Sequence, residues 1–377
     1  PFASLRLRGK NIITLNTECP DRVIPQSDVT FSGPPLSGTV LFSQKLFVQM
    51  KRVLKYLGFA LGAVVLFLAA AAAYFQIKGI PEFEPGLPDG LAELQVPRDS
   101  AHVAEGQRIA SMLCKKCHTD PSSGKLTGTI MTDVPPMFGT IATYNITHDS
   151  VSGVGAWSDG ELYYFLRTGL HKDGSWSPPF MPKFNHLADE DVYAIIAWLR
   201  SDDPALAPDR REYPPNDYNL TCRVLSNTLF SPPPMPAQPI LRPGIQDQVA
   251  TGRYLANDLL GCYHCHSGDL LKVDGEVAEN SFRFYGGGAE MKNENGEVVR
   301  TANLTPDPET GIGRWTEQQF TDAVRFCKNP RGGMLHYPMS PYSALTEQEA
   351  AAIWAYLKTI PPINNPVDRY KSAGVNQ

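Results

Sequence analysis

The residues with the clearest chemistry are the two thiols and the imidazole in the run Cys114-Lys115-Lys116-Cys117-His118. Cysteines three positions apart, with histidine directly after the second, form the attachment signature of a c-type haem. Each thiol can add to one vinyl group of the porphyrin, and the histidine then places its imidazole on the iron. A zinc site would need a second ligand pair at finger or ribbon spacing. A thioredoxin-like redox motif would not need the histidine.

A second copy of the motif, Cys262-Tyr263-His264-Cys265-His266, strengthens the haem interpretation. Two copies in one chain predict two covalently bound haem c groups. The expected attachment residues and histidine ligands are Cys114, Cys117, His118, Cys262, Cys265 and His266.

An internal repeat surrounds the two motifs, and this indicates two similar structural units. Asn145-Ile146-Thr147, Gly153 and Trp157 recur with an offset of 158 as Asn303-Leu304-Thr305, Gly311 and Trp315. The motifs themselves are offset by 148, so the second copy has ten extra residues between motif and asparagine. The glycines at 286–288 and the polar run 293–297 lie there, and we expect them to form an inserted surface loop.

Each haem needs a sixth iron ligand if it is to be a six-coordinate electron carrier, and methionine is a common choice. Eight methionines follow residue 78, but only Met181 and Met339 occupy equivalent positions in the repeat. Both lie beside prolines, which stiffen a loop that must hold a sulfur near the iron. Any single methionine could instead be core filler. The rival ligands, none with a histidine counterpart in the other copy, are His171, His186 and His336.

Helices are expected to position these side chains. Apolar residues at helical spacing predict three helices in each unit. One runs into the motif, one lies further along the chain, and one closes the unit. Thr346 is a candidate N-cap for the last of them. The expected ranges are 103–113, 158–166, 189–200, 250–260, 316–324 and 347–358.

A membrane segment is expected at residues 50–78. Residues 56–75 are uncharged and almost wholly apolar, and about 20 helical residues span roughly 30 Å, enough to cross a bilayer. Lys51, Arg52 and Lys55 precede the run, so the positive-inside bias puts its N-terminus in the cytoplasm. A cleaved signal peptide is the alternative. Both interpretations export residues 79–377, which suits haem c because bacteria attach it after export.

Residues 1–49 show no sustained periodicity, and we interpret them as upstream or expression-derived sequence, or as a cytoplasmic tail. After residue 78 the chain holds 25 basic and 36 acidic residues, a net charge of −11. Such an acidic exported part argues against nucleic-acid binding and suits steering toward basic redox partners. The expected location is the bacterial inner membrane, with the haem domains on the periplasmic side.

Residues 202–242 are rich in proline and predict a semi-rigid linker between units at 79–201 and 243–377. Cys222 lies in this stretch and Cys327 in the second unit. In an oxidising compartment these two thiols could form a disulfide, or both could stay free.

The two units resemble class I cytochrome c domains. The run 303–315, with Asn303-Leu304-Thr305-Pro306-Asp307 and Gly311-Ile312-Gly313-Arg314-Trp315, resembles the cytochrome subunits of membrane-bound alcohol and gluconate dehydrogenases; 145–157 is a looser match. The resemblance implies an all-α fold of two tandem class I domains after an N-terminal transmembrane helix. It also implies His118/Met181 and His266/Met339 ligation. Those subunits usually carry three haem domains, whereas this chain has two motifs.

Together these features predict an electron-transfer protein rather than an enzyme: a membrane-anchored dihaem cytochrome. Its expected donor is a dehydrogenase or quinol-oxidising complex, and its expected acceptor a soluble cytochrome or terminal oxidase. One alternative is a dihaem peroxidase, which would need an open iron position that a methionine at both haems would block. Another is a docking subunit of a larger membrane complex.

Overall fold

The computed structural model describes residues 37–132, 134–211, 213–293 and 295–368, with side chains described from residue 47. Helices dominate this part of the chain. Residues 69–377 form one compact unit, and residues 1–68 are a separate one. The expected N-terminal extension lies largely outside the described residues.

The first helix, α1 (Ser37–Lys78), includes the predicted membrane segment. Its part Phe47–Lys78 is long and apolar enough to cross a membrane, and its side chains are exposed. Helix α1 therefore begins earlier in the chain than the expected anchor, because residues 39–49 contain neither glycine nor proline.

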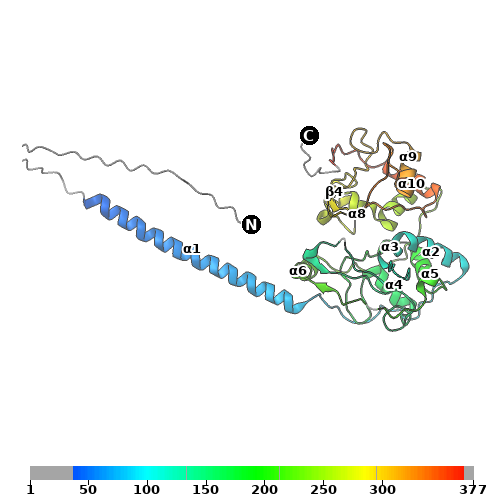
Figure 1. Cartoon of the computed structure of the whole chain (residues 1–377), viewed down its shortest axis with the longest axis horizontal. Coiled ribbons are helices and arrows are strands. Elements are labelled where there is room, and N and C mark those ends of the chain that lie inside the picture. Colours follow the sequence, from blue (N-terminus) through cyan, green and yellow to red (C-terminus); the bar gives the residue numbers. More distant parts are fainter. Residues whose placement is uncertain (1–36, 133, 212, 294, 369–377) are drawn as a thin grey trace, which may run out of the picture. The chain divides into compact units, whose positions relative to one another are not determined.

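The compact unit consists of two halves that can be followed in Figure 1. The first half contains the following elements: α2 (Ser100–Leu113), α3 (Lys115–His118), η1 (Pro136–Phe138), β1 (Gly139–Thr140), α4 (Asp159–Thr168), α5 (Asp189–Leu199), η2 (Pro204–Leu206), β2 (Asp217–Tyr218) and α6 (Leu220–Thr228). The second half contains α7 (Gln248–Arg253), η3 (Tyr254–Leu259), α8 (Cys262–His266), η4 (Leu270–Lys272), η5 (Ala278–Asn280), β3 (Glu290–Lys292), β4 (Val298–Arg300), α9 (Glu317–Phe326) and α10 (Glu347–Leu357).

In each half, the helix before the motif crosses the closing helix at a glycine. A Cβ on Gly106 of α2 would lie 1.8 Å from the carbonyl oxygen of Ala194 in α5. A Cβ on Gly252 of α7 would lie 1.9 Å from that of Ala352 in α10. Only glycine permits backbones to approach this closely. The sequence comparison of the two copies did not single out these glycines.

Three helices begin with reciprocal caps, which explains where they start. Ser158 caps α4 with Glu161 as its partner, Thr316 caps α9, and Thr346 caps α10 with Glu349. In each capping box the hydroxyl accepts from one orphan N–H while the partner side chain accepts from another. The predicted cap at Thr346 is confirmed.

The helix that enters the second motif departs from the expected regular helix at 250–260. It turns π-helical over η3, and Gly261 then adopts a left-handed conformation with φ of 60°. Gly106 precedes Cys114 by eight residues, whereas Gly252 precedes Cys262 by ten. The wider turn and the left-handed glycine accommodate the two extra residues, a usual origin of π-helical turns.

Two small antiparallel sheets add to the expected all-α fold. Strand β1 pairs with β2, with Gly139 opposite Tyr218, and β3 pairs with β4, with Met291 opposite Val299. Strand β2, helix α6 and η2 all fall in the predicted linker at 202–242. There Leu206 and Cys222 are buried, so this stretch packs as part of the first half.

The inserted segment of the second half is not the loop that the sequence suggested. The N–H of Gly128 donates to the carbonyl of His118 at 2.9 Å, and the N–H of Gly287 donates to that of His266 at 2.7 Å. These two glycines are therefore equivalent, and the extra residues lie before Gly287, around η4 and η5. The expectation for 286–288 and 293–297 was wrong, because the hairpin there corresponds to the bridge between Ile130 and Ala142.

Candidate functional site

The first motif opens onto a largely apolar cavity. The cavity is lined by the motif residues Cys114, Cys117 and His118. It is also lined by Met181, which lies in the loop between α4 and α5. The structure thus brings together all four residues predicted for the first site. The rest of its lining is mostly apolar or aromatic, from Leu113, Met131, Ile141, Ala142, Thr143, Tyr144, Ser177, Phe180, Pro182, Phe184, Asn216 and Tyr218.

The ring of His118 is held by a backbone carbonyl. Its Nδ1 lies 2.7 Å from the oxygen of Tyr144, and Nδ1 of His266 lies 2.9 Å from that of Ala302. A carbonyl can only accept, so in both histidines Nδ1 donates and Nε2 keeps its lone pair. Burial lowers the pKa of His118, which favours the neutral ring. This is the tautomer that a metal-binding imidazole requires.

A buried asparagine follows each of these carbonyls and fixes its position. Oδ1 of Asn145 accepts from the N–H and the hydroxyl of Thr147, at 2.9 and 2.7 Å. Oδ1 of Asn303 accepts from Thr305 at the same two distances. Asparagine can accept and donate at once, and each amide also donates 2.7 Å to a distant carbonyl, of Asp209 or Ile363. These positioning residues served the sequence comparison only as repeat markers.

The two methionine loops are secured differently. Nζ of Lys183 donates to the carbonyl of Met181 at 2.7 Å, and its stem passes over Gly169, where a Cβ would lie 2.0 Å from Cε. The carbonyl of Met339 instead faces Sγ of Cys327 at 4.0 Å. Burial lowers the pKa of Lys183 to about 7, so its amine is only partly charged at neutral pH. In either form the amine is a better donor than a thiol, so the first loop is held more firmly. No sequence signal marked Lys183.

In the second half, the motif forms helix α8, and Met339 is half-buried against the hydrophobic core, as is Cys262. Tyr342, three residues after Met339, also packs against this core, and burial raises the pKa of its hydroxyl. His264 bonds back to the carbonyl of Gly261 at 3.2 Å.

The rival histidines have other surroundings. The ring of His171 lies among aromatic rings, 5.2 Å from that of Trp157 and 4.7 Å from that of Phe165. His186 lies 3.1 Å from the carbonyl of Gly275. Neither lines the first cavity.

Burial also shapes the thiols of the two motifs. It raises the pKa of Cys114 and of Cys262 to about 12, so both stay protonated at neutral pH. Cys222 and Cys327 are buried free thiols, and no bridge joins them in the structure. Over the described residues, no group of three or more His, Cys, Asp or Glu side chains is placed to hold a metal ion, as a zinc centre would need.

Residues 103–202 match the family model for cytochrome c. This part of the chain is therefore a cytochrome c domain.

The chain is similar to cytochrome c subunits of dehydrogenases. It is 31% identical to the cytochrome c subunit of the quinone-dependent alcohol dehydrogenase of Gluconacetobacter polyoxogenes, over 73% of this chain and 59% of that protein. It is 26% identical to the gluconate 2-dehydrogenase cytochrome c subunit of Pantoea cypripedii, over 70% and 60%. A diheme cytochrome c-type protein of Cereibacter sphaeroides is 25% identical, over 80% of this chain and 97% of that protein. The chain thus spans less than two thirds of the dehydrogenase subunits and nearly all of the diheme protein.

Proposed function

We propose that the chain holds two haem c groups in tandem domains and relays electrons through them. Cys114 and Cys117 would hold the first group, with His118 and Met181 as iron ligands. In the second domain the same roles would fall to Cys262, Cys265, His266 and Met339. The observation that carries the proposal is the first cavity, which gathers both thiols, the imidazole and the thioether. The second site is supported by the repeat and by its matching histidine bond.

The residues present fit haem c, whose iron would supply a one-electron change between ferrous and ferric states. His118 presents a neutral imidazole whose orientation is fixed by Tyr144. Met181 presents a soft thioether, a ligand that favours the reduced iron and raises the reduction potential. The apolar lining excludes water, which tunes the potential further. With both axial positions filled, no substrate would bind at the metal.

The domain boundaries we propose are 79–201 and 243–377, with 202–242 joining them. We also propose that α1 anchors the chain in the bacterial inner membrane with both domains on the periplasmic side. The three basic residues before the apolar run, Lys51, Arg52 and Lys55, support this orientation.

The donor would be a dehydrogenase or a quinol-oxidising complex, and the acceptor a soluble cytochrome or a terminal oxidase. Similarity to the cytochrome subunits of alcohol and gluconate dehydrogenases supports a dehydrogenase as donor. Co-purification after mild detergent extraction tests it: a flavin- or quinone-containing dehydrogenase retained with the cytochrome supports this donor.

Carbon monoxide uptake tests the ligation. The reduced protein should contain two haems per chain and bind no carbon monoxide, because both irons are closed. Met181→Ala and Met339→Ala should each open one haem to the gas. Met137→Ala and Met334→Ala, at exposed methionines of the same halves, are the matched controls and should bind none.

An unaltered protein that takes up the gas at both haems refutes the proposed ligation. A high-spin haem that also reacts with peroxide would instead indicate the dihaem peroxidase alternative.

A further inference from the structure

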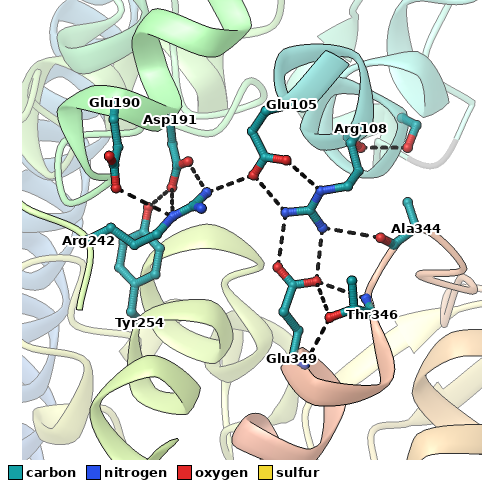
Figure 2. Close-up of polar contacts among 10 residues, drawn as sticks. Glu105, Arg108, Glu190, Asp191, Arg242, Tyr254, Ala344, Thr346 and Glu349 are labelled. Atoms are coloured by element: carbon teal, nitrogen blue, oxygen red, sulfur yellow. Dashed lines mark hydrogen bonds and ion pairs between the residues drawn. The ribbon is translucent and has the colours of Figure 1, made fainter. Parts of the chain in front are cut away.

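An arginine from the first half is clamped by the second half. Arg108 lies in α2, six residues before Cys114. Its guanidinium donates to both carboxylate oxygens of Glu349 in α10, at 2.9 and 3.0 Å, and to the carbonyl of Ala344 at 3.2 Å. Its remaining donors bond Glu105 on its own helix at 2.8 Å. Figure 2 shows this fork-to-fork arrangement, a geometry that is both strong and specific.

A second contact joins the same two halves, but here the donor comes from the second half and the acceptor from the first. Tyr254, the first residue of η3, donates its hydroxyl to the carboxylate of Asp191 in α5. The same hydroxyl accepts from the N–H of Ala188 at 3.0 Å. Here a helix that enters the second motif holds the closing helix of the first half. Both Tyr254 and Asp191 are buried.

The two contacts occupy equivalent positions of the repeat. Gly106 and Gly252 mark the same helix crossing, an offset of 146, so Arg108 is equivalent to Tyr254. The offset of 158 that relates the closing helices makes Asp191 equivalent to Glu349. Residue i of one half therefore contacts residue j of the other, and j contacts i. This reciprocity is the mark of a twofold, isologous interface.

Arg242 connects the two contacts through the chain that joins the halves. It donates to Glu105 at 2.8 Å and to Asp191 through Nε at 3.2 Å, and it lies 3.7 Å from Glu190. Figure 2 shows the resulting row from Glu190 to Glu349. Two arginines thus pair with four carboxylates in a partly buried seam, where ion pairs are screened less by salt than at the surface.

The two halves also meet next to the proposed ligands. Lys116, inside the first motif, places Nζ 5.0 Å from the ring centroid of Tyr337. Tyr337 precedes Met339 by two residues. The attachment motif of the first half thus contacts the methionine loop of the second.

We infer that the two halves form a pseudo-twofold pair, and that Arg108 and Tyr254 are positioning residues for electron exchange between the two haem sites. The inference rests on the proposed function. With haem bound, one electron would pass from the reduced group of one site to the oxidised group of the other, and no bond would form or break. At a given driving force, the rate would fall as the distance between the two sites grows.

The test uses the full-length, haem-loaded protein and three variants that keep side-chain size. Arg108→Gln removes the fork, Glu349→Gln removes its acceptor charge, and Tyr254→Phe removes only the hydroxyl. Glutamine at 349 can still serve the capping box of α10. Glu347→Gln, at an exposed position on the first turn of the same helix, is the matched control.

Two measurements are made on each variant. The first is the rate of electron equilibration between the haems after rapid reduction by less than one electron per protein. The double variant Arg108→Gln/Tyr254→Phe should slow it about tenfold, equivalent to a loss of ~1.4 kcal/mol in favour of the docked arrangement. The second is amide hydrogen exchange at 346–349, which should speed up in Arg108→Gln. Glu347→Gln should change neither.

The effects of Arg108→Gln and Glu349→Gln on these two measurements should also be non-additive, because both substitutions remove the same contact. An unchanged equilibration rate in Arg108→Gln/Tyr254→Phe overturns the inference, whether or not amide exchange has changed. Additive effects of Arg108→Gln and Glu349→Gln also overturn it. Failure of the proposed function would appear earlier and differently, as an unaltered protein with one haem or with haems open to carbon monoxide.

Discussion

Replacement of Gly106 by alanine tests the packing that holds the first motif in place. The added Cβ would lie 1.8 Å from the oxygen and 2.5 Å from the carbon of the Ala194 carbonyl, and 2.9 Å from Cβ of Trp198. All three atoms belong to backbone or to a fully buried side chain, so none can swing away. Helices α2 and α5 must therefore move apart by more than 1 Å to restore an ordinary contact of 3.0 Å or more.

The cost of this separation can be bounded. Overpacking of a well-packed core costs about 1–3 kcal/mol or more. Against this, alanine gains about 1 kcal/mol over glycine in a helix. Because two backbones must separate, we take the upper end of this cost, about 3 kcal/mol, which leaves a net loss of about 2 kcal/mol. This corresponds to a fall of roughly 4–8 °C in Tm for a unit of about 150–250 residues.

Differential scanning calorimetry of the haem-loaded protein measures the fall. Gly252→Ala should give a similar result in the second half, where the Cβ would lie 1.9 Å from the Ala352 oxygen. Gly244→Ala, where a Cβ would meet nothing within 4 Å, is the control. If Gly106→Ala melted at or above the temperature of the unaltered protein, the close crossing of α2 and α5 would be wrong.

Four further outcomes are expected. Asn145→Ala should cost about 1–3 kcal/mol of unfolding free energy in urea, because it leaves buried groups without partners. Thr346→Ala should cost about 1 kcal/mol in the same assay through the lost cap of α10. Burial raises the pKa of Asp258 to about 6, so its ionisation opposes folding above its ordinary pKa. Asp258→Asn should therefore raise Tm at pH 7, with the gain shrinking as pH falls from 6 toward 4. Cys222 and Cys327 should both react with a thiol reagent, but only after unfolding; if neither reacts, a bridge joins them.

Much of the first site could be predicted from sequence because its chemistry depends on residue type and local spacing. The motif fixes both thiols and His118 within five residues. The repeat then selected Met181 from eight methionines, and the cavity contains it. Six expected helices lie within a few residues of their predicted ranges because their apolar faces and caps are local signals.

The features that sequence missed depend on contacts between distant segments. Gly106 has no local signal, since its need for close approach arises only when α5 packs on it. Helix α6 and strand β2 lie in a proline-rich stretch that resembles a linker, and burial of Cys222 shows what that pattern concealed. The extra segment of the second half was predicted at the wrong place because composition does not show where it lies. Its position follows from the hydrogen bond between the N–H of Gly287 and the carbonyl of His266.

The repeat explains the shared parts of the two halves, and its exceptions explain how they differ. Equivalent positions build the helix crossings, the asparagine bonds and the reciprocal pairs Arg108–Glu349 and Tyr254–Asp191. The segment inserted before Gly287 contacts the first half. There His186 bonds to the carbonyl of Gly275 and lies 3.8 Å from the carboxylate of Glu276. Only one side of the seam has such a segment. The interface is therefore twofold in its helices and one-sided at this edge, so the two proposed haem sites have different surroundings.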